Sequence, residues 1–134
     1  MMSSELHEEY ARILEESRRR GDLVAQSGAS ERRTHPRLSV KAADLWISSV
    51  PEFSVVDLSA SGVALMANYP LKPGEVVTMS LGSAISIEAE VVHCQLVESP
   101  TDYSDAVFRI QCRFPEEVKG MQLVVQVKQH EYAN

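Results

Sequence analysis

The spacing of apolar residues predicts a helix near the start of the chain. Over residues 4–20 the apolar positions recur three and four residues apart, so they fall on one helical face. These positions are Leu6, Tyr10, Ile13 and Leu14. Glutamates fill the first turns, arginines fill the last turn, and Gly21 provides a stop signal. Small and polar residues follow, and we therefore assign residues 1–30 to an N-terminal amphipathic helix and its linker.

From Leu38 onward apolar and polar residues alternate, which is typical of half-buried antiparallel strands. We expect six strands, over residues 38–48, 53–59, 62–68, 75–82, 85–97 and 105–114. In the fifth strand the alternation shifts after Val91, which predicts a β-bulge at 91–92. Short consecutive strands separated by turn signals predict a mainly β protein, a closed or nearly closed six-stranded antiparallel β-barrel within residues 31–134.

The end of the chain, residues 115–132, fits two kinds of secondary structure. The run 123–127 is rich in valine and favours a strand by propensity. Pro115 followed by two glutamates favours the first turn of a helix, and Val118 and Met121 would then share a face. We predict a C-terminal helix that packs across a barrel opening.

Composition and charge narrow the class of protein. The 134 residues, 44% hydrophobic and 24% charged, suit a folded globular chain and exclude wholesale disorder. The net charge of −6 argues against binding to a nucleic-acid polymer, which needs an excess of lysine and arginine. Two cysteines are too few for a secreted disulfide scaffold, and the acidic N-terminus is unlike a secretory signal. No apolar run is long enough to span a bilayer, so we expect a cytoplasmic protein without membrane insertion.

Basic residues are concentrated in one part of the chain, because six of the 13 lysines and arginines lie between positions 18 and 37. Three of them, Arg32, Arg33 and Arg37, come directly before the first predicted strand. Pro36 disfavours a helix at the residue before it, so we expect these arginines on a mobile loop. Planar guanidinium groups bind phosphate oxygens and the N7/O6 edge of guanine. The loop is therefore a candidate site for a small anion.

A second cluster lies where the second predicted strand ends and the third begins. Asp57 and Ser59 are two residues apart, so both side chains project from the same face of the sheet, whereas Leu58 points into the core. Gly62 permits a close approach that a side chain would block. Alone, this pattern also fits an ordinary hairpin turn. Beside an arginine-rich loop, a carboxylate and a hydroxyl can hold the arginines and accept from guanine N–H groups.

Together the two clusters resemble the signature of the PilZ domain family, bacterial receptors for cyclic di-GMP. The pair Arg33-x-x-x-Arg37 is followed twenty residues later by Asp57-x-Ser59-x-x-Gly62, in a chain that predicts a six-stranded barrel. The resemblance implies that Arg33 and Arg37 grip the phosphates and guanine faces of cyclic di-GMP. It implies equally that Asp57, Ser59 and Gly62 form the opposing wall of the site.

The resemblance also carries expectations about the arginine-rich loop. In the family, the residue before the first motif arginine influences whether one cyclic di-GMP or an intercalated pair is bound. Here that residue is Arg32, whose extra charge favours the pair. Many relatives have glycine in the closing strand where this chain has Gln111, so we expect either the floor of the site or the local strand geometry to differ. We expect the mobile loop, residues 30–37, to order over the barrel when ligand neutralises its arginines, and to reposition the adjoining helix.

Other classes of protein fit less well. Four histidines are scattered without a nucleophile–base spacing, so we expect a protein that is not an enzyme. His93 and Cys94 are neighbours on a predicted strand and point to opposite faces, so they cannot readily share a zinc ion with Cys112. We therefore expect no metal and no cofactor, and the resemblance implies cyclic di-GMP as the ligand.

Two binding alternatives and the identity of the partner stay open. A small β-barrel that binds single-stranded nucleic acid needs aromatic platforms and a basic groove, which an acidic chain with 6% aromatic residues does not offer. A PilZ-like interaction module that works without nucleotide would not need an intact ligand motif. The resemblance implies a protein effector in motility, polysaccharide or pilus machinery, and no residue in the chain identifies it.

Overall fold

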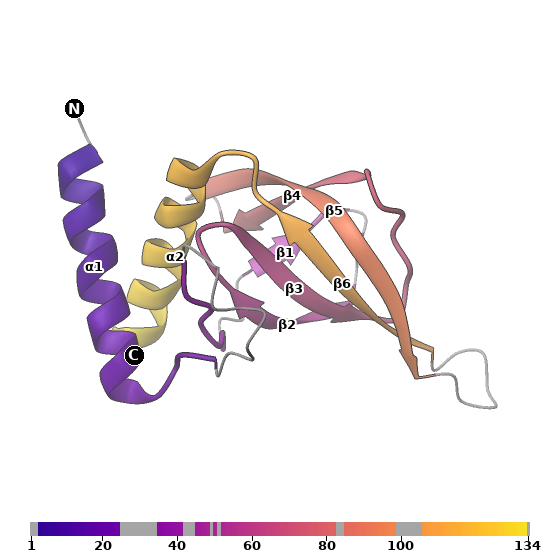
Figure 1. Cartoon of the computed structure of the whole chain (residues 1–134), viewed down its shortest axis with the longest axis horizontal. Coiled ribbons are helices and arrows are strands. Elements are labelled where there is room, and N and C mark those ends of the chain that lie inside the picture. The colour runs from indigo at the N-terminus through magenta and orange to yellow at the C-terminus, as the bar shows by residue number, and fades with distance from the viewer. Residues whose placement is uncertain are drawn as a thin grey trace.

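The structure is a computed structural model that describes residues 3–24, 35–41, 45–48, 50, 52–82, 85–98 and 106–133. Six strands lie between two helices along the chain (Figure 1). The elements are α1 (Ser3–Arg20), β1 (Leu45–Ile47), β2 (Phe53–Leu58), β3 (Gly62–Ala67), β4 (Val76–Leu81), β5 (Ile85–Glu98), β6 (Val107–Arg113) and α2 (Glu117–Tyr132). The helices predicted before and after the strands in the chain are therefore confirmed.

The six strands form one antiparallel sheet in the order β1-β4-β5-β6-β3-β2. Consecutive strands pair as hairpins from β2 to β3 and from β4 to β6, and β6 returns to lie beside β3. The sheet curls into a half-barrel, and the helices lie at one end of it (Figure 1). Leu65, Met79 and Ile110 are fully buried in its core. The predicted mainly β fold with six antiparallel strands is confirmed.

The fifth strand contains the predicted bulge. β5 is 14 residues long, and its register with β6 shifts between Val91 and His93 and again between Leu96 and Glu98. Val91 is buried, whereas the side chain of Val92 is about half exposed. An extra residue in one strand turns the following side chains, so the bulge at 91–92 faces Val92 outward.

The first strand is shorter than the sequence predicts. Of the expected strand 38–48, only Leu45–Ile47 are β1 in the part that the structure describes. Leu38 instead bridges Leu23 on one side and Leu58, at the end of β2, on the other. The segment that follows α1 returns to cover Leu38, which is fully buried. A short ladder of three segments therefore stands where one continuous strand was expected.

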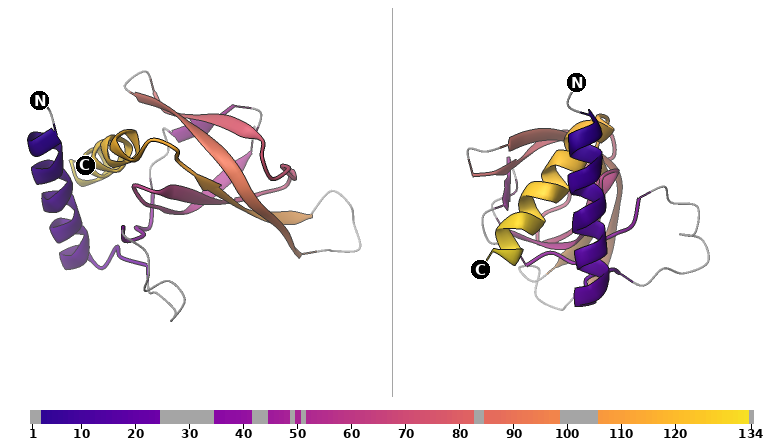
Figure 2. Two further views of the ribbon diagram at one scale, coloured as in Figure 1. Left: turned by 45° about the horizontal axis from the view of Figure 1, so that its top comes forward. Right: turned by 90° about the vertical axis from the view of Figure 1, so that its left-hand side faces the viewer.

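The helix α2 lies between α1 and the sheet, as both views in Figure 2 show. It packs on α1 with one side and on β4 and β5 with the other. A helix covered on two sides buries apolar residues around most of its circumference, and α2 does so at Met121, Leu123, Val124, Val125 and Val127. That double coverage explains why the run 123–127 also resembled a strand.

The helix α1 covers the outer side of α2 with the stripe that the sequence predicts. Leu6, Tyr10 and Ile13 are buried, and the charged residues of the helix face outward. Gly21 ends the helix with a φ of 76°, a conformation that favours glycine. Neither α1 nor α2 is long and apolar enough to cross a membrane, nor is any other helix in the described part of the chain.

Candidate functional site

A pocket of about 280 Å³ opens beside the turn that joins β2 to β3. Of the residues that the sequence singles out as a binding site, Arg37, Asp57, Ser59 and Gly62 line this pocket. Arg32 and Arg33 lie outside the described residues. The lining is completed by the turn before β3 and by β3, β5 and β6, with Ser61, Val63, Val92, Gln111, Cys112 and Arg113.

Backbone pairing on both sides places Arg37 at the pocket. The N–H of Val24 donates to the carbonyl oxygen of Arg37 at 2.9 Å. Leu38 and Leu58 exchange two backbone hydrogen bonds, at 2.8 and 2.9 Å. Since Asp57 adjoins Leu58, this ladder brings Nη1 of Arg37 to 3.5 Å from Oδ2 of Asp57. The expected mobile loop over 30–37 is therefore already held by the fold at its C-terminal end.

The ion pair between Arg37 and Asp57 is largely buried, with side chains that are 18% and 4% exposed. A buried carboxylate is costly unless a cation and hydrogen bonds compensate its charge. Arg37 therefore stabilises the charge of Asp57, and Asp57 holds the guanidinium against the pocket.

Ser59 closes the turn between β2 and β3. Its N–H donates to the carbonyl oxygen of Gly62 at 2.9 Å, and its hydroxyl oxygen accepts from the N–H of Ser61 at 3.1 Å. The backbone of this cluster therefore forms the ordinary hairpin turn that the sequence pattern also fitted. A hydroxyl that accepts one hydrogen bond can still donate its own proton, so Ser59 can also serve a ligand in the pocket.

The close approach predicted for Gly62 is to the neighbouring strand. A Cβ at this position would lie 2.1 Å from the carbonyl oxygen of Cys112 in β6. Gly62 is the register partner of Arg113 at the end of the β3–β6 ladder. The missing side chain therefore allows β3 and β6 to pair directly beneath the pocket.

The far wall of the pocket comes from β5 and β6, and of its residues the family resemblance had pointed to Gln111 alone. Gln111 and Arg113 lie two residues apart on β6, and the bulge in β5 adds Val92. Arg113 pairs with Glu90, and this pair is exposed, at 61% and 35%. Residues two apart on a strand share a face, so Gln111 and Arg113 lie on the same side of β6. The sequence holds no signal that this face adjoins Gly62.

The two cysteines are free thiols on adjacent strands. Burial, and to a lesser degree the neighbouring Cys94, raises the pKa of Cys112 to about 11. A thiol with that pKa stays protonated near neutral pH and is a poor metal ligand. Among the residues that the structure describes, no three His, Cys, Asp or Glu side chains are grouped to hold a metal ion.

A buried polar network connects α2 to the chain on both sides of the arginine-rich loop. Lys128, 1% exposed, pairs with Asp22 at 3.3 Å and Glu131 at 2.9 Å, and it donates to the carbonyl oxygen of Ser39. The hydroxyl of Tyr132 donates to Oδ2 of Asp22 at 2.7 Å. Burial alone would raise the pKa of Asp22, but the Tyr132 hydrogen bond and the Lys128 charge outweigh it and lower that pKa. The chain on both sides of the arginines is thus tied to the same helix.

The fold and the pocket together are typical of one class of protein. This class combines a curled antiparallel half-barrel with an arginine–carboxylate pair beside a tight turn. The model of the PilZ domain matches residues 31–129. The chain therefore belongs to the PilZ domain family, as its motifs indicated. The match includes the whole half-barrel and most of α2, and it leaves α1 outside. No curated protein sequence matches the chain.

Solved structures share this fold at low sequence identity. The complex of K. pneumonia MrkH with c-di-GMP aligns with a TM-score of 0.53 at 20% identity, over 77% of this chain and 55% of MrkH. The PilZ domain of YcgR from Escherichia coli with c-di-GMP aligns with a TM-score of 0.52 at 14% identity, over 77% of this chain and 96% of that domain. This chain thus spans about half the length of MrkH and nearly all of the YcgR domain.

Proposed function

We propose that this protein is a receptor for cyclic di-GMP, which it binds in the pocket beside the β2–β3 turn. The observation that carries the proposal is the meeting of Arg37, Asp57 and Ser59 around one pocket in a chain of the PilZ family. These residues belong to two separate motifs, and the ladder at Leu38 joins them. The shared fold of two c-di-GMP complexes supports the choice of ligand. The proposed activity is binding, without a catalytic step.

In this proposal the guanidinium of Arg37 is already positioned at the pocket before the ligand binds. A guanidinium has five N–H donors in a planar fork, so it can contact a phosphate or a guanine edge while Asp57 holds one corner. The low exposure of the pair strengthens such contacts, because less water competes with the ligand. Asp57 therefore acts mainly by orienting Arg37, and Ser59 offers a hydroxyl beside it.

The far wall supplies a second set of contacts. The exposed pair between Arg113 and Glu90 contributes little stability, so Arg113 can exchange the carboxylate for a ligand phosphate at small cost. Val92 offers apolar surface to a base, and the amide of Gln111 can both donate to and accept from guanine. A pocket with arginines on two walls suits the larger ligand, the intercalated pair that Arg32 favours.

Arg32 and Arg33 act from the segment between Val24 and His35 in this proposal. Neutralisation by the ligand allows these arginines to come together over the pocket. Ordering costs about 1–2 kcal/mol per residue, which the charge-assisted contacts must exceed. The hydrogen bond from the N–H of Val24 to the carbonyl oxygen of Arg37 joins the chain on the two sides of these arginines.

Calorimetric titration of the full chain with cyclic di-GMP tests the proposal. We expect saturable binding of two nucleotides per chain, and one per chain in Arg32→Ala. Arg33→Ala and Arg37→Lys should each weaken binding at least tenfold, about 1.4 kcal/mol. Arg37→Lys keeps a cation beside Asp57 but removes the planar fork. Arg18→Ala is the matched control, because Arg18 is an exposed arginine on α1.

Each outcome of the titration bears on a different part of the proposal. A wild-type protein that takes up no cyclic di-GMP would refute the receptor function and favour the interaction-module alternative. Unchanged affinity in both Arg33→Ala and Arg37→Lys would refute the assignment of the site. One nucleotide per wild-type chain would refute the intercalated pair and leave the receptor function in place.

A further inference from the structure

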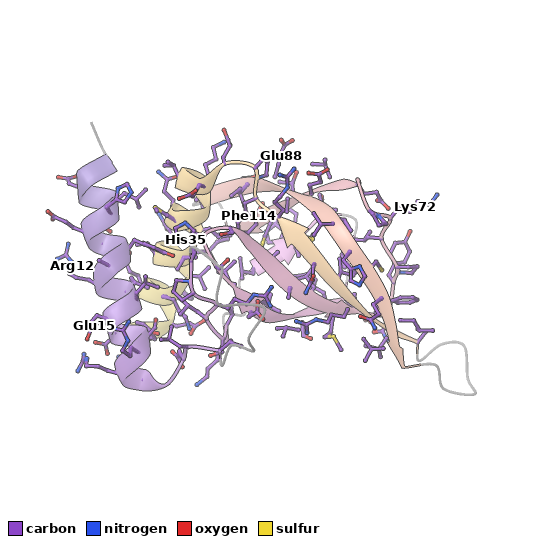
Figure 3. All side chains as sticks on the ribbon, in the orientation of Figure 1. Arg12, Glu15, His35, Lys72, Glu88 and Phe114 are labelled. Carbon is purple, nitrogen blue, oxygen red and sulfur yellow. The ribbon has the colours of Figure 1, made fainter. Side chains whose placement is uncertain are left out.

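His35 lies between the two motif arginines and is buried against both helices. It is 7% exposed, and Figure 3 shows it on the segment that passes beside α1 and α2. Its Nδ1 accepts a hydrogen bond from the Tyr10 hydroxyl of α1 at 3.0 Å. Its Nε2 donates to Oε1 of Glu117, in the first turn of α2, at 2.9 Å, since a carboxylate can only accept. The rings of Tyr10 and His35 also meet edge to face, with centroids 5.6 Å apart.

The partners of His35 are held by the helices and not by the barrel. Tyr10 belongs to the buried stripe of α1 and is 6% exposed. Burial, together with the charge of Glu117, raises the pKa of the Tyr10 hydroxyl to about 12, so it remains a hydrogen-bond donor at neutral pH. Loss of this contact would leave a buried polar atom without a partner, which costs more than the bond itself contributes. The docked helix α1 therefore fixes the position of His35.

The position of His35 in turn constrains Arg37. Pro36 stands between them and fixes one backbone torsion, so little freedom separates the two residues. We propose that α1, through Tyr10 and His35, positions the arginine motif for the nucleotide, and that nucleotide binding in turn strengthens the docking of α1. This inference rests on the proposed function. In it Tyr10 and His35 are positioning residues that act through Arg37.

The direction of the coupling follows from the docked arrangement. With α1 on α2, Arg37 already faces Asp57 at the pocket, so the docked state is the one prepared to bind. If release of α1 lowers the affinity for nucleotide, thermodynamic linkage requires that nucleotide oppose the release by the same factor. Because α1 lies outside the family match over residues 31–129, an element beyond the family core provides this coupling.

Tyr10→Phe tests the link, because it keeps the ring and removes only the hydroxyl. We expect about fivefold weaker binding of cyclic di-GMP, the loss of one hydrogen bond. Hydrogen–deuterium exchange of the full chain gives the second measurement: saturating nucleotide should slow exchange in α1 of the wild type, and much less in Tyr10→Phe. Gln129→Ala is the matched control. It removes another bond between the same helices, from Nε2 of Gln129 to Glu9 at 3.3 Å, and should leave the nucleotide effect on α1 intact.

The outcomes separate this inference from the proposed function. A wild-type protein that binds nucleotide without any change of exchange in α1 overturns the inference and leaves the receptor function standing. Equal slowing in the wild type and in Tyr10→Phe overturns the assignment to Tyr10 and His35. A wild-type protein that does not bind overturns the proposed function itself. The wild-type comparison with and without nucleotide does not depend on how well a variant folds.

Discussion

Gly120 allows a direct test of how α2 packs on the turn between β2 and β3. A Cβ at this position would stand 1.9 Å from the carbonyl oxygen of Ala60, between β2 and β3. An ordinary contact is 3.4 Å or longer, so Gly120→Ala requires α2 and the turn to move apart by about 1.5 Å at this contact. The turn cannot yield freely, because the carbonyl oxygen of Ser61 accepts from the N–H of Phe114 at 2.8 Å and Gly62 is pressed against β6.

Two effects of the Gly120→Ala substitution oppose each other. Alanine in place of glycine inside a helix adds about 1 kcal/mol of stability by propensity. Overpacking costs about 1–3 kcal/mol, and the upper part of that range applies here because both sides of the contact are backbone. We therefore expect the free energy of unfolding to fall by about 1–2 kcal/mol.

Urea denaturation followed by circular dichroism measures this change. Lys119→Ala is the control, because Lys119 adjoins Gly120 in the helix and its side chain is 51% exposed, so its effect should stay within about 0.5 kcal/mol. Cyclic di-GMP should also bind more weakly to Gly120→Ala, since the displaced turn carries Ser59. If Gly120→Ala is instead more stable than the wild type, propensity alone acts and α2 does not rest on the turn.

Two further predictions concern buried ionisable groups. Lys128→Met should cost about 3–5 kcal/mol in chemical denaturation, because Asp22 and Glu131 lose their buried cation; Asp22→Asn in that background should restore part of it. A loss below about 1 kcal/mol would contradict this reasoning. At pH 8 a thiol reagent should modify Cys94 first, because a pKa of about 11 leaves only about 0.1% of Cys112 as thiolate. Equal labelling rates for the two thiols would contradict this expectation. The folded protein holds the Cys112 proton more tightly than the unfolded chain, so the contribution of the buried thiol to the free energy of unfolding should decline as the pH rises above 9.

Local patterns in the sequence were enough to predict most of the elements. The stripe Leu6, Tyr10 and Ile13 lies on one face of α1, the helix ends at Gly21, and the bulge falls at 91–92. Each of these features depends on residues a few positions apart. The spacing of side chains along a helix or a strand therefore contains the necessary information.

Contacts between distant segments could not be predicted in this way. Lys128 looks like a surface lysine in the sequence, yet it is 1% exposed, because α2 is covered on two sides and Asp22 arrives from beyond α1. Leu38 was assigned to a continuous strand, but the returning segment at Leu23 pairs with it instead. Nothing in the local pattern shows which segment covers which.

The candidate site shows the same division. Asp57 and Ser59 line one pocket, in keeping with the alternation of side chains on a strand. Arg113 reaches that pocket only because β6 pairs with β3, although β4 and β5 separate these two strands in the chain. The shared face of Gln111 and Arg113 was visible in the sequence, whereas its place beside Gly62 required the strand order.

The burial of His35 changes the mechanism that we propose for the arginine motif. If the whole arginine-rich loop were mobile, the ligand would have to order it, at a cost of about 1–2 kcal/mol for each residue. His35 is hydrogen-bonded to both helices and Arg37 is paired with Asp57, so the C-terminal end of the arginine-rich loop is already ordered when the protein folds. The ligand therefore does not have to offset the entropy of ordering that end. In the proposed receptor, the affinity for the nucleotide then depends on how stably α1 and α2 are docked. A substitution that frees His35 should therefore weaken binding, although His35 faces the helices and not the pocket.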